Sequence, residues 1–176
     1  MSQDALDRDT LDGERDVVDV IVEQWRRERP DLDPGAKEVS GRIVRLASLF
    51  QESYGDVFEP LGLNDGDYGL LAALRRAGLP FELTPTELAR HMMMTSGGMT
   101  AAIDRLERKG FAVRVPNPAD RRGSLVRLTE AGHEVIDEAM TQHVHTEQGL
   151  VATLDEREQA QLRNLLRKLL RAIDTR

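Results

Sequence analysis

The chain has 176 residues, of which 40% are hydrophobic and 4% aromatic, so one compact domain with helical extensions can form around an aliphatic core. It contains no cysteine, which excludes disulfides, a thiolate zinc site and a cysteine redox switch. No apolar run reaches the roughly 18 residues of a membrane-spanning helix, and the acidic residues 1–10 lack the features of a signal peptide, so we expect a cytoplasmic protein with no membrane partner.

The charge of the chain is unevenly distributed. Its formal net charge is −7, but residues 84–128 carry eight basic and four acidic side chains, a net charge of +4, which leaves −11 for the remainder. A protein that contacts phosphates through one face needs a basic segment only on that face. The distribution therefore indicates one nucleic-acid-binding segment on an acidic body.

Residues 1–11 are polar and are expected to be disordered, and three helices are predicted after them. The first covers residues 12–29 and stops at Pro30, and a turn at 30–35 separates it from the second, which runs to about Pro60 with one apolar stripe. The third begins at Asn64, with Asp67 three residues later, and ends near Gly78.

The segment 83–128 has the pattern of a helix, a short turn, a second helix and a β-hairpin. Thr84, Pro85 and Glu87 form a strong helix start with a capping box, and this first helix ends near residue 91. Thr95 or Ser96 starts the second helix, whose apolar face is at 99, 102, 103 and 106. Strands at 111–115 and 124–128 are predicted to flank an eight-residue tip at 116–123.

Two further helices complete the predicted fold. Thr129 caps a helix that reaches about Leu154, and Asp155 with Glu158 starts a last helix that ends near Ile173. The apolar faces of the first, second and last helices are too large to be covered within one chain, and we infer a two-fold homodimer. The predicted fold is mainly α with a small β-hairpin wing: a winged helix-turn-helix DNA-binding lobe at 63–128, and a helical dimerisation region at 12–62 and 129–176.

The second helix of the pair and the hairpin tip are the candidate DNA-binding surfaces. Small residues in the first turn of the helix allow close approach to base edges, and free N–H groups there favour phosphate. Arginines at a hairpin tip can enter the minor groove, with an adjacent aspartate orienting one of them. Each feature alone also fits a solvated surface. The candidate DNA-binding residues are Thr84, Thr95, Ser96, Gly97, Gly98, Thr100, Ala101, Arg105, Arg108, Asp120, Arg121 and Arg122.

Four motifs within residues 36–173 resemble those of the multiple-antibiotic-resistance-regulator (MarR-type) transcription factors. They are LTPTELA at 83–89, IDRLERKG at 103–110, DRR at 120–122 and LTEAG at 128–132. The resemblance implies a homodimeric winged helix-turn-helix repressor that binds a palindromic double-stranded DNA operator. It also implies release of that operator when a small-molecule effector binds, for which an aromatic or phenolic anion is the expectation.

The additional N-terminal helix with Trp25 resembles the urate-responsive branch of that family. This branch uses a tryptophan, an aspartate and two arginines; Trp25 and Arg114 match, whereas Gly69 and Ala102 occupy the other two positions. Each lost charged hydrogen bond is worth roughly 1.5–3 kcal/mol, so we predict no response to low micromolar urate. The candidate ligand-binding residues are Trp25, Arg42, Arg45 and Arg114. Alternatively, Arg42 and Arg45 are ordinary surface charges, and Trp25 is an anchor of the dimer interface.

Other chemistry has little support in the sequence. His143 and His145 fall on nearly opposite faces of a helix, and His133 with Asp137 offers only two ligands, so neither a metal site nor another cofactor is predicted. The three consecutive methionines at 92–94 fit a role in filling the core better than a role as an oxidation switch. No catalytic constellation is present, so an enzyme is not expected. The alternative function is a winged-helix protein-interaction or non-specific DNA-binding module without small-molecule control, which would show a DNA specificity ratio near one.

Overall fold

The computed structural model describes residues 15–92 and 95–174, without the side chains of Ser96, Arg121 and Arg122. The expected disorder of residues 1–11 therefore concerns a segment outside the described residues. The chain forms two compact units, residues 1–52 and 53–176. Within the described part of the chain, no helix is long and apolar enough to cross a membrane.

The first unit contains α1 (Val17–Glu28) and most of α2 (Lys37–Phe58). The predicted start of the first helix at residue 12 is wrong, because Asp16 is its N-cap: its carboxylate accepts from the N–H groups of Val18 and Asp19, and Asp19 returns a bond to the N–H of Asp16. Val18 and Val22 are buried. The turn at 30–35 is confirmed.

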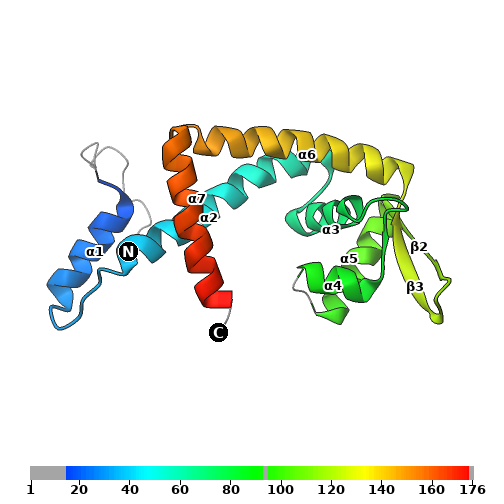
Figure 1. Cartoon of the computed structure of the whole chain (residues 1–176), viewed down its shortest axis with the longest axis horizontal. Helices are drawn as coiled ribbons and strands as arrows, with labels where there is room; N and C mark the ends of the chain where they lie inside the picture. The colour runs from blue at the N-terminus through cyan, green and yellow to red at the C-terminus, as the bar shows by residue number, and fades with distance from the viewer. Residues whose placement is uncertain (1–14, 93–94, 175–176) are drawn as a thin grey trace. The chain divides into compact units, whose positions relative to one another are not determined.

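The second unit contains the winged helix-turn-helix lobe and the last two helices (Figure 1). A 3₁₀ turn, η3 (Glu59–Leu61), follows α2. The remaining elements in chain order are α3 (Asp65–Arg76), β1 (Glu82–Leu83), α4 (Pro85–Met92), α5 (Ser96–Arg108), β2 (Ala112–Asn117), β3 (Asp120–Leu128), α6 (Glu130–Val151) and α7 (Glu156–Asp174).

The helix starts in this unit are those that the capping residues predict. The side chain of Asn64 caps α3, Thr95 caps α5 and Thr129 caps α6. Asp155 forms a capping box with Glu158 at the start of α7. Local hydrogen bonds of this kind need no tertiary partner, which is why the sequence is enough to predict them.

The β-sheet differs from its prediction in two respects. The three strands are antiparallel in the order β1-β3-β2. The predicted eight-residue tip is wrong: the strands continue until Asn117 pairs with Asp120, with an irregularity at Pro116, so only residues 118 and 119 lie between them. Backbone pairing along the hairpin outweighs the turn preference of Pro, Asn and Gly. The two-residue edge strand β1 was not predicted, since it is too short to show a periodicity.

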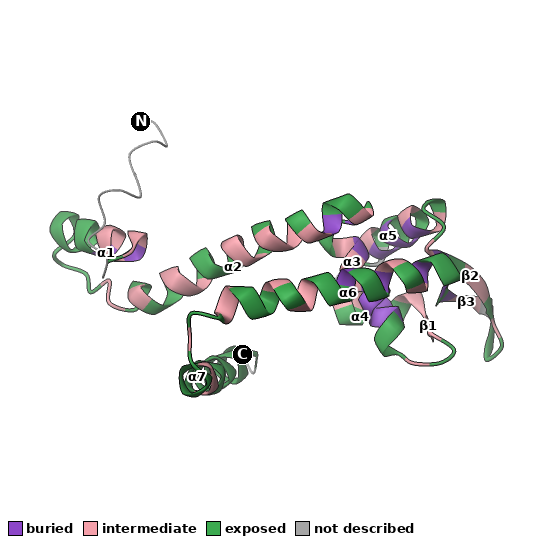
Figure 2. Cartoon of the chain, turned by 90° about the horizontal axis from the view of Figure 1, so that it is seen from above, coloured by how far each residue is buried: buried purple, intermediate pink, exposed green. Residues whose placement is uncertain are grey.

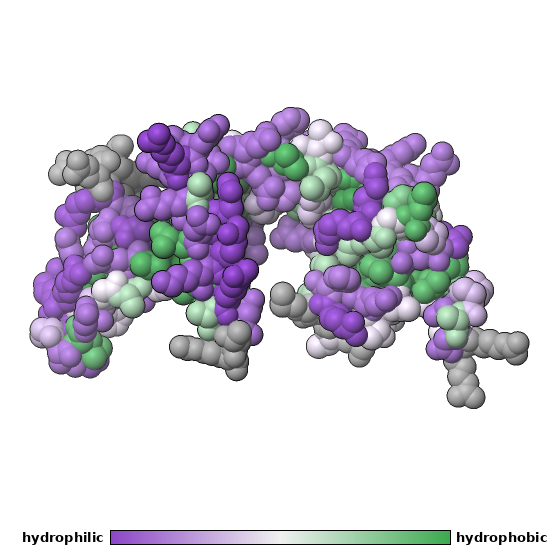
Figure 3. Space-filling model, in the orientation of Figure 1, coloured by the Kyte–Doolittle hydropathy of each residue, from purple (hydrophilic) through white to green (hydrophobic). Residues whose placement is uncertain are grey.

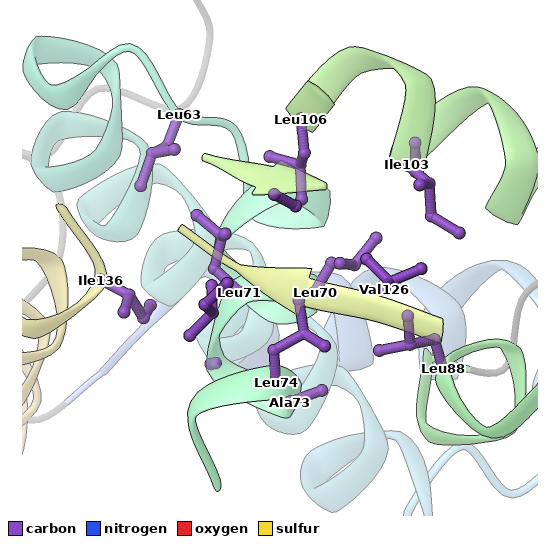
Figure 4. Packing of buried hydrophobic residues seen from close by; sticks show 14 of the residues in the cluster. Leu63, Leu70, Leu71, Ala73, Leu74, Leu88, Ile103, Leu106, Val126 and Ile136 are labelled. Carbon is purple, nitrogen blue, oxygen red and sulfur yellow. The ribbon is translucent and has the colours of Figure 1, made fainter. Parts of the chain in front are cut away.

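The core of the second unit lies between α3, α4, α5, β3 and α6 (Figures 2 and 4). Leu70, Leu71 and Leu74 of α3 contribute fully buried side chains at its centre. The predicted apolar face of α5 is confirmed, because Met99, Ala102, Ile103 and Leu106 are all buried. This core fixes α5 with one face inward and leaves the opposite face to solvent.

The junction between the wing and α6 is unusually close. A Cβ added to Gly132 would lie 1.9 Å from the carbonyl oxygen of Phe111, the residue that precedes β2. The N–H of Thr129 donates to the same carbonyl, and its hydroxyl donates to the carbonyl of Gly110. Glycine in the LTEAG motif thus allows α6 to start directly against the base of the wing.

Helix α7 exposes its apolar face in the single chain. None of the residues of α7 is buried, and Figure 2 shows the helix almost entirely as exposed. The face of the molecule seen in Figure 3 is mostly hydrophilic, with hydrophobic groups showing through in several places. The exposed apolar side chains of α7 are Leu162, Leu165, Leu166, Leu169, Leu170 and Ile173.

Candidate nucleic-acid interface

Helix α5 presents a row of small and polar residues on the face opposite the core. The hydroxyl of Thr95 accepts from the N–H of Gly98 at 3.3 Å and so caps the helix. The exposed residues along this face include four of the candidate DNA-binding set: Gly97, Thr100, Ala101 and Arg108. The side chain of Ser96 lies outside the described part. A helix with this face can bring its backbone close to base edges.

Helix α4 is fixed at its start by a reciprocal capping box. The N–H and the hydroxyl of Thr84 both donate to one carboxylate oxygen of Glu87 at 2.8 Å, and the N–H of Glu87 donates back to the hydroxyl at 3.1 Å. The backbone bond from Thr84, followed by its hydroxyl bond, lowers the pKa of Glu87 from its ordinary value. The predicted DNA-binding hydroxyl of Thr84 is therefore engaged within the helix start.

One flank of α5 is held by a buried carboxylate of α3. Asp67 has 0% exposure, and its two oxygens accept from Arg105 Nε at 2.7 Å and from Lys109 Nζ at 2.6 Å. Lys109 Nζ also donates to the carbonyl of Gly62 at 2.6 Å. The sequence indicated Asp67 only as part of a helix start. Its burial was missed, since nothing in the local pattern shows which helix packs over it.

The opposite flank of α5 carries the reverse arrangement of charges. Arg114 of β2 pairs with Asp104 at 2.6 Å and with Glu107, whose other oxygen accepts from the backbone N–H of Arg114 at 2.8 Å. This candidate ligand-binding arginine thus ties the wing to α5. An anionic ligand at Arg114 would compete with two carboxylates.

The wing places its arginine pair near the turn of the hairpin. Arg121 and Arg122 are the second and third residues of β3, and their side chains lie outside the described part. Asp120, the predicted orienting residue, is the first residue of that strand, and its carboxylate lies beside Gly123. At the base of the wing, Arg127 of β3 pairs with Glu82 of β1.

The other candidate ligand-binding residues belong to the first unit. Trp25 of α1 is 47% exposed, and Arg45 of α2 is exposed as well. Arg42 joins α2 to α1, because its Nη2 donates to Asp19 at 2.7 Å and its Nε to Asp16 at 2.8 Å. The hydrogen bond to Asp19, followed by the one to Asp16, raises the pKa of Arg42 from its ordinary value. Arg42 therefore has a structural role, and its binding to a ligand stays a prediction.

The two positions that depart from the urate-responsive pattern are filled by apolar packing. Ala102 is buried in the core. A Cβ added to Gly69 would lie 2.5 Å from the terminal methyl of Met92, which occupies the space beside α3. The structure thus puts a thioether where the related pattern has a carboxylate.

Two of the histidines considered as metal ligands, His133 and His143, contact aromatic rings. His133 packs edge-on against Phe81 at 4.3 Å, and Asp137 pairs with Arg75. His143 lies among aromatic rings, with Tyr54 at 4.3 Å. Within residues 15–92 and 95–174, no three histidine or carboxylate side chains converge as metal ligands.

Taken together, the three-helix core, the outward face of α5 and the adjacent hairpin define a winged helix-turn-helix DNA-binding protein. The MarR family model matches residues 61–123. The HTH-type transcriptional regulator PecS of Dickeya dadantii is 35% identical over 85% of this chain and 90% of its own length. The multiple antibiotic resistance protein MarR of Escherichia coli is 31% identical over 74% of this chain and 90% of its own.

Two solved structures with DNA share this fold. A mutant MarR from Escherichia coli complexed with operator DNA has a TM-score of 0.67 at 28% identity, over 83% of this chain and 97% of that one. Sco3205 of Streptomyces coelicolor, in complex with DNA, has a TM-score of 0.71 at 26% identity, over 80% of this chain and 89% of that one. The chain belongs to the MarR family of transcriptional regulators. The predicted family, fold class and DNA-binding regulatory function are confirmed.

Proposed function

We propose that this protein is a ligand-responsive repressor that binds a palindromic operator as a homodimer. The observation that carries the proposal is the outward face of α5, where Gly97, Thr100 and Ala101 are exposed while ion pairs hold both flanks of the helix. We assign this face to the major groove and Arg121 and Arg122 to the minor groove. The related MarR structure, which is complexed with operator DNA, supports the binding of an operator by a protein of this fold.

The exposed face of α7 supports the proposed homodimer. Its six apolar side chains are 40% to 60% exposed in the single chain, on one helical stripe. A stripe of this kind in a soluble regulator is stable when a second copy covers it, and an isologous interface repeats each contact by two-fold symmetry. Two lobes related by two-fold symmetry would read two half-sites of opposite orientation.

Selection of bound duplexes from a random-sequence pool tests the proposal directly. We expect an inverted repeat to emerge, and the purified dimer to bind it at least about 10³-fold more tightly than a scrambled duplex of the same length. Fluorescence anisotropy gives both dissociation constants. A specificity ratio near one would contradict the proposal and favour a non-specific DNA-binding or protein-interaction module.

We propose an aromatic or phenolic anion as the effector, with Trp25 as one of its contacts. Trp25 is the single tryptophan of the chain, so its fluorescence reports on that position alone. We expect benzoate or salicylate to quench it and to release the selected operator over the same concentration range, whereas benzyl alcohol, which lacks the negative charge, does neither. Quenching without release would remove Trp25 from the effector response.

Urate is predicted not to act as the effector at low micromolar concentration. Gly69 and Ala102 supply neither the carboxylate nor the guanidinium of the urate-responsive pattern, and Met92 and the core fill their surroundings. An operator-release titration with urate, run beside the benzoate titration, measures this. Release of half of the operator at a few micromolar urate would show the prediction to be wrong.

A further inference from the structure

Asp67 holds two cations on the flank of α5 that lies beside the outward face. Arg105 and Lys109 are one helical turn apart, and both bond to the same buried carboxylate. Their side chains are 32% and 31% exposed, so each has a route to solvent if the carboxylate is removed. The cluster contains one negative and two positive charges.

Arg105 lies on the helix that would enter the DNA groove, and Lys109 is the C-cap of that helix. A lysine or arginine that neutralises a phosphate strengthens binding to any sequence, because it releases counterions regardless of the bases. Contacts to base edges, in contrast, discriminate between sequences. A regulator gains specificity when cations near its reading surface are kept from the phosphates.

The geometry also fixes how α5 is turned about its own axis. Lys109 is bound at once to Asp67 and to the carbonyl of Gly62, and a Cβ added to Gly66 would lie 3.7 Å from Arg105 Nη2. Both side chains are thereby directed toward the start of α3. A rotation of α5 that carries these two side chains away from Asp67 and onto the outward face would break these bonds.

We propose that Asp67 is a specificity-determining positioning residue, which withholds Arg105 and Lys109 from phosphate and keeps the small, polar face of α5 toward the bases. This inference rests on the proposed function, since it assumes operator binding through that face. It removes Arg105 from the candidate DNA-binding residues and leaves Arg108, which is exposed, among them.

The test compares Asp67→Asn with Asp65→Asn. Both variants remove one negative charge from the first turn of α3, but Asp65 is exposed. Affinities for the selected operator and for random-sequence duplex are measured between about 50 and 200 mM salt. For Asp67→Asn we expect tighter binding to random DNA, a salt slope steeper by about 1.8 per lobe, and a lower specificity ratio. For Asp65→Asn we expect values close to those of the wild type.

A purely structural role for Asp67 gives a different result. If folded Asp67→Asn binds both duplexes more weakly in proportion, with an unchanged salt slope, the inference is overturned. If the wild-type protein itself does not discriminate between the two duplexes, the proposed function fails. If it discriminates and Asp67→Asn binds random DNA as the wild type does, only the present inference fails.

A second pair of variants covers the case in which Asp67→Asn does not fold. Lys109→Gln leaves Arg105 on Asp67, and we expect it to keep the wild-type salt slope for the operator because Lys109 does not contact phosphate. Arg108→Gln, on the exposed face of the same helix, is expected to lower the magnitude of the slope by about 0.9 per lobe. A loss of that size in Lys109→Gln would overturn the inference.

Discussion

Single residues of the second unit determine how closely neighbouring elements can approach each other. Gly132 is the sharpest case, because its lack of a Cβ allows α6 to start in contact with the carbonyl of Phe111. Asp67 is the corresponding polar case, since the burial of its carboxylate is compensated by two cations, while its backbone N–H donates to the capping side chain of Asn64. In both cases, the identity of one residue determines how two elements approach each other.

Gly132→Ala is expected to destabilise the protein by about 1–3 kcal/mol, since the added methyl must displace backbone rather than a flexible side chain. Urea denaturation followed by circular dichroism measures the change. Gly149→Ala, on the same helix with nothing within 4 Å of the added Cβ, is the matched control. It is expected to be stabilising by about 0.5–1 kcal/mol. Equal losses in the two variants would contradict the explanation.

Arg121→Ala and Arg122→Ala are each expected to weaken operator binding by about 1–3 kcal/mol while leaving the dimer intact, because an arginine in the minor groove contributes affinity only in the complex. Anisotropy titration and sedimentation measure the two properties. Arg157→Ala, in the first turn of α7, is the control, because it removes the same charge outside the lobe. Unchanged affinity in both wing variants would remove the wing from the mechanism.

Among the elements, α5 is held from both sides by ion pairs of opposite polarity. On one flank its cations meet the carboxylate of Asp67, and on the other its carboxylates meet the guanidinium of Arg114. The apolar face of α5 was predictable from spacing, because four residues at helical intervals must face one core. The flank contacts were not predictable, since they join positions 38 to 42 residues apart or cross from helix to strand.

Helix α4 provides a pH-dependent prediction. Hydrogen bonds from Thr84 lower the pKa of Glu87, so the carboxylate stabilises the folded state above its ordinary pKa of 4.5, and this contribution is lost as the pH falls through the lowered value. We expect Glu87→Gln to be less stable than the wild type at pH 7 and the difference to shrink below about pH 4.5. Urea denaturation at several pH values measures it.

The same capping box supplies a control for charge. Thr84→Ala removes the hydroxyl that accepts from the N–H of Glu87 and is expected to cost about 1 kcal/mol. The Glu87 bond to the backbone N–H of residue 84 remains available in this variant, so part of the pH dependence is retained. If the stability difference of Glu87→Gln is the same at pH 3 and pH 7, the charge of Glu87 does not contribute.

For the molecule as a whole, the exposed stripe of α7 predicts a dimer that one charge can break. Leu169→Glu places a carboxylate in the stripe, where pairing would bury it without a partner, and we expect a shift from dimer to monomer. Asn164→Glu adds the same charge on the opposite face of the helix and is expected to remain dimeric. Sedimentation velocity distinguishes them. A dimer of unchanged stability in Leu169→Glu would place the interface elsewhere.

The division of the chain into a lobe at 63–128 and a dimerisation region on either side stays a prediction. The structure groups residues 53–176 into one compact unit, so the last turns of α2, together with α6 and α7, fold with the lobe. Phe58 explains the boundary, because it is buried and stacks on Tyr68 of α3 at 4.3 Å. A helix that serves two units cannot be divided from its pattern alone.

Features that depend on neighbouring residues could be predicted from the sequence. Capping side chains set the starts of five helices, helical spacing set the inward face of α5, and four short motifs were enough to indicate the family. Features that depend on partners far along the chain were visible only in the folded protein: the length of the hairpin strands, the edge strand β1, and the burial of Asp67 beneath Arg105 and Lys109. The physical reason is that a capping bond or an apolar stripe is stabilised within one turn or one helix, whereas a strand end or a buried charge is stabilised only by the element that packs against it.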